Sequence, residues 1–319
     1  MKVLNFGSLN LDYTYSVDHM VRPGETLASS KMQVFCGGKG LNQSAAMAKA
    51  GVQVFHAGLI GEDGQPLLDM CRESGVDTTY IRRGEGRGGH TIIQVDKNAQ
   101  NCILLYGGTN RQITREFADE VLENFVEGDL LVLQNEINEL DYIIDRAYER
   151  KMRIILNPSP YDSALDACDM TKISVFLLNE IEGEQMTGEK EPDNILAVMK
   201  ERYPKAQTVL TLGTEGAVYQ YGDTVIRQSA FLVEAVDTTA AGDTFTGYFV
   251  AGLLEGRPME QILRRCAMAS AICVSRPGAT AAVPTPEEVE ANFRNSSALL
   301  NRSMQNSFKI AGGDGILHS

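Results

Sequence analysis

The stretch VDTTAAGDTFTGYFVAGLLEG, residues 236–256, carries the strongest structural signal in the chain. From Phe245 its apolar residues recur at Phe249 and Leu253, which is the i, i+4, i+8 stripe of a buried helix. Gly256, followed by Pro258, is a typical helix end. The pattern therefore predicts a helix that begins near Ala241 or Gly242.

The start of this helix is chemically unusual. Its first backbone N–H groups have no intrahelical partner, and the small residues Ala240, Ala241 and Gly242 leave them open to an anionic ligand. Asp243 lies in the first turn, where a lone aspartate is most often a helix cap. The alternative is that its carboxylate accepts a proton beside a bound anion.

A second glycine-rich motif, CGGKGLNQSAAMAKAG, occupies residues 36–51. Its glycines allow close backbone approach, and we expect Asn42 to open a helix that Gly51 ends. The motif is neither the P-loop G-x-x-x-x-G-K-[ST] nor the dinucleotide fingerprint G-x-G-x-x-G. An NAD-dependent oxidoreductase therefore lacks its main support.

Short apolar runs alternate with helical patterns through most of the chain. Strands are predicted at 2–9, 52–60, 130–134, 153–156, 175–178 and 208–212, and helices at 42–50, 64–74, 115–126, 139–149 and 193–201. This βαβ alternation predicts an α/β fold, with a mostly parallel central sheet flanked by helices on both faces.

Two stretches, 11–36 and 88–106, alternate polar and apolar side chains instead. That period of two predicts antiparallel strands with one wet face, forming a small antiparallel β lid, or else edge strands of the main sheet. A last helix is expected from Pro286, with Thr285 as N-cap. We expect one folded domain to span 1–293 and residues 294–319 to form a flexible tail.

Composition excludes several function classes. The 319 residues carry a net charge of −13, which argues against binding nucleic acid. No apolar run is long enough to cross a membrane, and the N-terminus is too polar for a secretory signal. Six scattered cysteines read as reduced core thiols, without a disulfide or zinc pattern. A cytoplasmic location is expected on these grounds.

Seven motifs, in order along the chain, resemble those of the ribokinase-like (PfkB) carbohydrate kinases over about residues 1–293. They are GSLNLD (7–12), RPGET (22–26), GGKGLNQ (37–43), LLNEIE (177–182), TLGTEG (211–216), DTTAAGDTFTG (237–247) and SRPGA (275–279). The resemblance implies an ATP-dependent kinase that phosphorylates a sugar, with D-ribose at O5 as the expected acceptor. Asp243 is then the general base, and Ala240, Ala241 and Gly242 form the anion hole.

The resemblance also assigns the substrate sites. It implies that Asn10, Asp12, Gly38, Lys39, Asn42 and Glu136 bind the sugar, and that Thr211, Gly213 and Gly216 bind the nucleotide. Asn179 and Glu182 match the family's pair for Mg²⁺, which they would hold through water. Taken singly, each residue has an alternative interpretation as a structural residue that binds no ligand. Glu182, for example, suits the start of a helix.

Two further features follow from the family. A potassium site matches Asp237, Thr239, Cys273, Arg276 and Gly278, although Ala282 replaces a serine ligand. The lid implies a homodimer, and His90 and Ile92 are expected to contact the sugar or the partner's lid. Another pentose, a ketohexose or a nucleoside remains open as acceptor, as does a non-catalytic sugar-binding relative.

Overall fold

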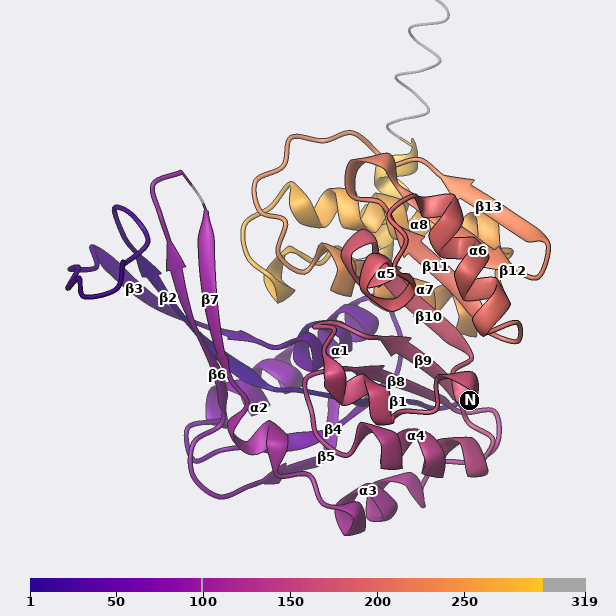
Figure 1. Ribbon diagram of the computed structural model, residues 1–319, viewed down its shortest axis with the longest axis horizontal. Helices are drawn as coiled ribbons and strands as arrows, with labels where there is room; N and C mark the ends of the chain where they lie inside the picture. The colour runs from indigo at the N-terminus through magenta and orange to yellow at the C-terminus, as the bar shows by residue number, and fades with distance from the viewer. Residues whose placement is uncertain (99, 295–319) are drawn as a thin grey trace, which may run out of the picture.

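The computed structural model describes residues 1–98 and 100–294 as a large α/β body with a small sheet that stands away from it (Figure 1). The central sheet has nine strands in the order β13-β12-β11-β10-β9-β8-β1-β4-β5. The seven strands from β11 to β5 in this spatial order are parallel to one another. Strands β12 and β13 extend the β11 edge as antiparallel strands. In chain order their bounds are β1 Val3–Phe6, β4 Val54–Ile60, β5 Asp77–Arg83, β8 Leu130–Gln134, β9 Arg153–Asn157, β10 Val175–Asn179, β11 Gln207–Thr211, β12 Ala217–Tyr221 and β13 Thr224–Gln228.

Helices cover both faces of this sheet. One face packs α1 Lys39–Lys49, α2 Gln65–Glu73, α7 Ala241–Leu254 and α8 Met259–Val274. The other packs α3 Arg115–Leu122, α4 Leu140–Glu149, α5 Glu180–Thr187 and α6 Pro192–Arg202. Short 3₁₀ turns are η1 Gly108–Arg111, η2 Ser163–Ala167, η3 Met170–Lys172, η4 Gly213–Glu215 and η5 Thr280–Ala282. The predicted α/β fold, with helices on both faces, is confirmed.

Strand alternation divides the core into two layers. In β1, Val3 faces the α1 side, whereas Leu4 and Phe6 face the α3–α6 side. Both sets are fully buried, as expected for strands of a parallel sheet that is covered twice. Because both faces pack against helices, a shift of register would disrupt side-chain packing on each face, so the ends of the parallel strands are held in place.

The small sheet, called the lid below, contains β3 Lys31–Gly37, β2 Asn10–Ser16, β6 Gly89–Val95 and β7 Asn101–Tyr106, in that spatial order. It is separate from the main sheet, as predicted. The prediction that it is antiparallel is wrong at its centre, where β2 and β6 run parallel. The reason is the connection: the chain passes through α1, β4, α2 and β5 of the body between the two strands.

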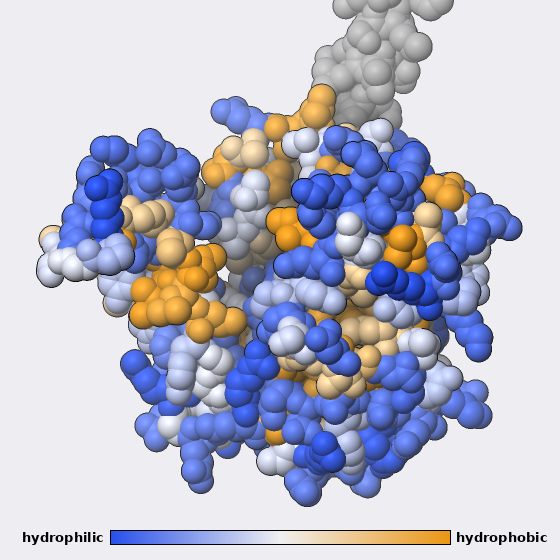
Figure 2. All heavy atoms as spheres, in the orientation of Figure 1, coloured by the Kyte–Doolittle hydropathy of each residue, from blue (hydrophilic) through white to orange (hydrophobic). Residues whose placement is uncertain are grey.

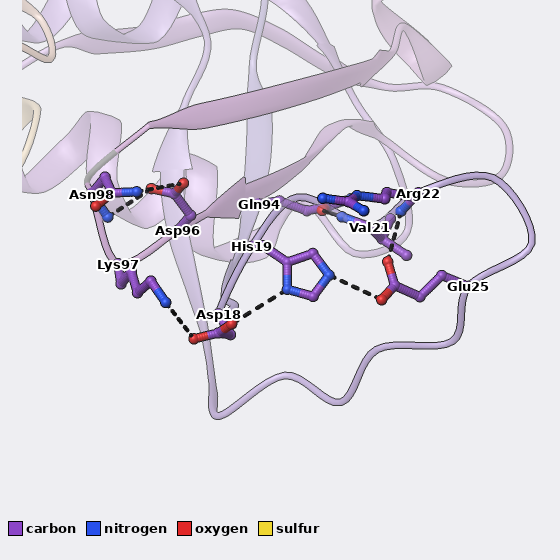
Figure 3. A network of polar contacts seen from close by, with 9 residues as sticks. All are labelled: Asp18, His19, Val21, Arg22, Glu25, Gln94, Asp96, Lys97 and Asn98. Atoms are coloured by element: carbon purple, nitrogen blue, oxygen red, sulfur yellow. Dashed lines mark hydrogen bonds and ion pairs between the residues drawn. The ribbon is translucent and has the colours of Figure 1, made fainter.

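A polar network at the outer end of the lid orders the loop between β2 and β3 (Figure 3). His19 lies between the carboxylates of Asp18 and Glu25, and Lys97 donates to Asp18. The Val21 amide donates to Gln94 of β6. The Glu25 and Asp18 carboxylates raise the pKa of His19. These contacts tie the loop to the neighbouring strand.

Several predicted boundaries need correction. The strand predicted at 2–9 ends at Phe6, and the chain enters the lid from Asn10. The helix predicted to open at Asn42 begins at Lys39, because Gly38 adopts a φ of 90° and its carbonyl accepts the Asn42 amide. Helix α8 and strands β5, β12 and β13 were not predicted. Residues 286–294 are helical, and Thr285 accepts the Glu288 amide as predicted.

Other expectations concern the cysteines and the chain end. All six cysteines are free, but Cys102 is exposed on the lid instead of lying in the core. The tail expected after Phe293 lies almost entirely outside the described residues. Within the described ranges, the helices are too short or too polar to span a bilayer.

Candidate active site

The N-terminal corner of α7 presents free backbone donors to open space. Ala240 precedes the helix in the left-handed region, with φ 59° and ψ 13°, and its side chain makes no capping bond. The Ala241 amide makes a long bond of 3.4 Å to the Thr238 carbonyl. Among the described residues, the amides of Gly242 and Asp243 have no acceptor. A Cβ atom added at Gly242 would meet nothing within 4 Å, so an anion can approach these donors.

The Asp243 carboxylate does not cap its own helix. It is 8% exposed and accepts Nε2 of Gln43 at 3.0 Å on Oδ1 and Nδ2 of Asn42 at 3.3 Å on Oδ2. Both donors belong to α1, so this helix holds the carboxylate next to the open corner. Oδ1 of Asn42 is buried without a partner among the described residues and can accept a hydroxyl.

The start of α1 is held against the ends of β1 and β8. Oε2 of Glu136 accepts the Lys39 amide at 2.9 Å and the Ser8 hydroxyl. A Cβ atom at Gly40 would lie 2.3 Å from the Ser8 nitrogen, which explains why glycine is required there. Gly38, Lys39, Asn42 and Glu136 of the predicted sugar site are thereby brought together, next to Asp243.

Asn10 and Asp12 lie at the base of the lid. Asn10 is buried, and its Oδ1 accepts Nδ2 of Asn110 at 2.7 Å. Oδ1 of Asp12 accepts the Thr91 hydroxyl at 2.6 Å. Burial raises the pKa of Asp12, and the nearby charge of Glu136 adds to this, while the Thr91 bond opposes it. A Cβ atom at Gly37 would lie 1.9 Å from Oδ2 of Asp12, so a larger residue there would displace this carboxylate from its present position.

His90 and Ile92 lie on the face of β6 that is opposite to Asp12. Asp12 pairs with Thr91 across the β2–β6 ladder, so Thr91 and Ile93 share its face, and Leu105 of β7 joins them. His90 instead contacts the rings of Tyr13 and Tyr106. An open hollow of about 460 Å³ lined by Arg87, His90, Ile92, Leu104 and Tyr106 lies on that far face and is separate from the site.

The residues expected at the nucleotide and magnesium lie at the ends of β10 and β11. Asn179 and Glu182 form a capping box for α5: the Glu182 amide donates to Asn179, and Oε2 of Glu182 accepts the Asn179 amide, each at 2.9 Å. This is the structural interpretation of Glu182 given above. Because the two side chains satisfy each other, they fit a hydrated Mg²⁺ better than direct coordination. Thr211 ends β11, and Gly213 and Gly216 both have positive φ in the turn that follows.

The predicted potassium ligands meet around Asp237. Its carboxylate accepts the amides of Thr239 at 2.9 Å and Gly278 at 3.0 Å, joining the loop before α7 to the loop after α8. Burial raises the pKa of Asp237, but the bonds from Thr239 and Gly278 outweigh it, so the pKa lies below its usual value. Cys273 faces the Thr239 carbonyl, Arg276 pairs with Glu288, and Ala282 is buried.

The prediction missed several polar residues that build the site. Gln43 lies in the quoted glycine-rich motif but was not assigned a role, and Ser8, Thr91 and Asn110 were not singled out. A further set, Asn5, His56 and Gln134, is fully buried in the central strands. The sequence signal was available, because Asn5 and His56 interrupt, and Gln134 ends, otherwise apolar strands of a parallel sheet.

Comparison with known proteins identifies the family. The sequence model of the pfkB family carbohydrate kinases matches residues 1–286. The chain belongs to the pfkB family of carbohydrate kinases. It is 34% identical to the ribokinase of Haemophilus influenzae over 292 residues, covering 88% of this chain and 95% of the relative. A deoxyribokinase of Salmonella typhi is 29% identical over 297 residues, covering 90% and 97%.

A solved structure agrees with this assignment. The ribokinase of Arabidopsis thaliana complexed with ribose and ATP superimposes with a TM-score of 0.80 at 26% identity, covering 91% of this chain and 97% of that one. The ribokinase-like fold inferred from the seven motifs is therefore confirmed, as is the family.

The buried histidine makes stability depend on pH. Burial lowers the pKa of His56 to about 4 from 6.5, although the bond to the Gly7 carbonyl opposes this. Between pH 6.5 and pH 4, His56 binds a proton in the unfolded chain but remains neutral in the folded chain. We expect His56 to have no effect on the pH dependence of the free energy of unfolding above pH 6.5. As the pH drops to 4, the free energy of unfolding should fall by up to about 3 kcal/mol.

Urea unfolding at a series of pH values measures this loss. A His56→Gln variant should show a flatter decline between pH 6.5 and 4. His19→Gln, which removes an exposed histidine with a raised pKa, should keep the steep decline. Equal slopes in wild type and His56→Gln would contradict the assignment.

Proposed function

We propose that the protein is an ATP-dependent ribokinase that transfers the γ-phosphoryl group to O5 of D-ribose. The observation that carries this proposal is the buried Asp243 carboxylate, held by α1 beside free amides at the start of α7. Such a corner can accept a proton and hold a developing anion at the same time. The similarity to ribokinases, one of them solved with ribose and ATP, supports the choice of substrates.

In the proposed reaction, Asp243 accepts the proton of the sugar hydroxyl as its oxygen attacks the γ-phosphorus. The amides of Ala240, Ala241 and Gly242, together with that of Asp243, hold the negative charge of the phosphoryl group in transfer. These donors are fixed by the helix before the substrate arrives, so they need no reorganisation during the reaction. Mg²⁺ bound with ATP supplies charge neutralisation at the phosphates, and Asn179 and Glu182 would hold it through water.

The sugar hydroxyls are expected to meet the polar residues between α1 and the lid. Asn42 offers a free Oδ1, and Asp12, Asn10 and Glu136 lie on the same side of the site. From the lid, the register favours Thr91, Ile93 and Leu105 as the residues that cover the sugar. His90 and Ile92 face away from Asp12 and are assigned to the outer surface.

Potassium activation is proposed at the two loops joined by Asp237, next to the anion-binding corner. The ligands would be mostly carbonyl oxygens of this segment, including those at Thr239 and Cys273, although the Cys273 carbonyl already accepts the Arg276 amide. With Ala282 in place of a hydroxyl ligand, we expect activation to be weak. A cytoplasmic location is consistent with the free cysteines and with the supply of ATP.

We further propose that two lids pack together in a homodimer. Figure 2 shows an apolar patch on the lid, which is unusual for an exposed sheet. The exposed side chains on the His90 face are Met32, Val34, Ile92, Leu104 and Tyr106, and each is at least 41% exposed. A second copy of the same sheet is the simplest partner that covers such a surface.

Activity is tested by ADP release from Mg·ATP with D-ribose, 2-deoxy-D-ribose, other pentoses, fructose and nucleosides, with and without K⁺. We expect strong turnover with D-ribose and a loss of about 10²–10⁴-fold in kcat for Asp243→Asn, because the amide cannot accept the proton. Asp237→Asn provides a control at the other end of the same loop, with a smaller loss. If no acceptor stimulated ADP release, the kinase assignment would fail; turnover on another sugar would change only the substrate.

The oligomeric state is tested by analytical ultracentrifugation of wild type and Leu104→Glu. Wild type should sediment at twice the chain mass of 34.9 kDa, and the charged variant as a monomer, because an unpaired carboxylate cannot be buried at the interface. Val126→Glu, at an exposed apolar residue on the body, should remain dimeric. A monomeric wild type would contradict the proposal.

A further inference from the structure

Three neighbouring strands each place a polar side chain under α1. Asn5 of β1, His56 of β4 and Gln134 of β8 lie on the same sheet face as the apolar core residues Val3 and Val132. All three polar residues have no exposed surface. Buried polar groups are costly unless they are hydrogen-bonded, so such a cluster requires an explanation.

The cluster is connected to the Asp243 carboxylate through Gln43. Nε2 of Gln134 donates to Oε1 of Gln43 at 2.7 Å and to Oδ1 of Asn5 at 2.9 Å. Nε2 of Gln43 then donates to Oδ1 of Asp243 at 3.0 Å. At the other end, Asn5 donates to the Gly40 carbonyl at 2.7 Å and to Ser44 at 2.8 Å.

The orientation of each amide in this network is fixed by groups that can only accept hydrogen bonds. The Gly40 carbonyl requires the amide nitrogen of Asn5, which turns Oδ1 of Asn5 toward Gln134. Gln134 must then donate, which turns the oxygen of Gln43 toward it and the nitrogen of Gln43 toward Asp243. If Gln43 were reversed, its oxygen would face the carboxylate.

The far end of the network is fixed in the same way. Ser44 contacts Nδ1 of His56 at 2.8 Å, and Nε2 of His56 contacts the Gly7 carbonyl at 3.2 Å. Because the Gly7 carbonyl can only accept, Nε2 carries the proton, and the Ser44 hydroxyl donates to Nδ1. Ser44 is therefore left to accept from Asn5.

We propose that Gln43 is a positioning residue for Asp243, and that Gln134 and Asn5 set the orientation of its amide from the Gly40 carbonyl. The inference rests on the proposed function of Asp243 as the base. Gln43 holds Oδ1 by the shorter bond, whereas Oδ2 has only the 3.3 Å contact with Asn42 and is the oxygen left for the substrate hydroxyl. Proton transfer needs such fixed geometry.

Steady-state kinetics on the full chain test whether Gln43 and Gln134 position Asp243. Gln43→Leu removes the donor, and we expect kcat to fall about 10–100-fold while KM for ATP changes by less than about twofold. Gln134→Met keeps a side chain of similar length, adds no charge and cannot donate to Gln43, whose amide is then free to reverse; we expect a similar fall in kcat. Gln134 donates to Asn5 and Gln43 and not to Asp243, so this second effect must pass through Gln43.

Tyr248→Phe is the matched control, because it removes a buried hydrogen bond, to the Pro284 carbonyl at 2.9 Å, from the same helix as Asp243. It should lower the melting temperature and leave kcat unchanged. In an Asp243→Asn background, Gln43→Leu should cause no further loss of kcat. Full additivity of the two changes, or wild-type kcat in Gln43→Leu, would overturn the inference, whereas an inactive wild type would overturn the proposed function instead.

An NMR measurement tests the hydrogen bond between Gln43 and Asp243 directly. With ¹⁵N-labelled glutamine side chains, wild type should show an amide signal that moves when Asp243 is changed to Asn and is absent in Gln43→Leu. This readout needs no turnover. A Gln43 resonance that does not respond to Asp243→Asn would also overturn the inference.

Discussion

The close contact between α1 and α7 is the constraint on which the active site depends. A Cβ atom added at Gly247 would lie 2.5 Å from the carbonyl carbon of Ala46, so the two helices approach to backbone contact. This brings Asn42 and Gln43 of α1 to the Asp243 carboxylate, in the first turn of α7 beside its open start. A wider separation would leave a buried carboxylate without donors, which is among the more costly arrangements in a protein core.

The parallel sheet supplies the second part of the site. Its strands end at one edge, where Ser8, Gln134 and Glu136 follow or end buried strands, and α1 begins directly above them. Ligand sites in open α/β sheets lie at this carboxyl edge as a general rule. Here the central strands also place polar side chains beneath α1. These side chains replace apolar packing and orient one carboxylate, and nearly all of their polar atoms are hydrogen-bonded among the described residues.

Much of this arrangement could be predicted from sequence, because periodicity and glycine placement act locally. The helix after Ala240, the strand at 130–134 and the capping role of Thr285 all follow from short-range rules. The parallel pairing of β2 with β6 could not be predicted, since it depends on where the chain goes between them. The same register decides that Thr91, and not His90, shares the face of Asp12. Asn5, His56 and Gln134 stand out in the sequence as polar residues of apolar strands, but their partners could not be predicted, because these lie far away in the sequence.

We propose that the corner of α7 directs phosphoryl transfer to one hydroxyl of ribose. The most direct measurement is ³¹P NMR of the product formed from Mg·ATP and D-ribose, with coupling to the sugar protons resolved. We expect a single phosphomonoester coupled to the two C5 protons, with ADP released in equal amount. Phosphate on another carbon, or free inorganic phosphate with unmodified ribose, would contradict it.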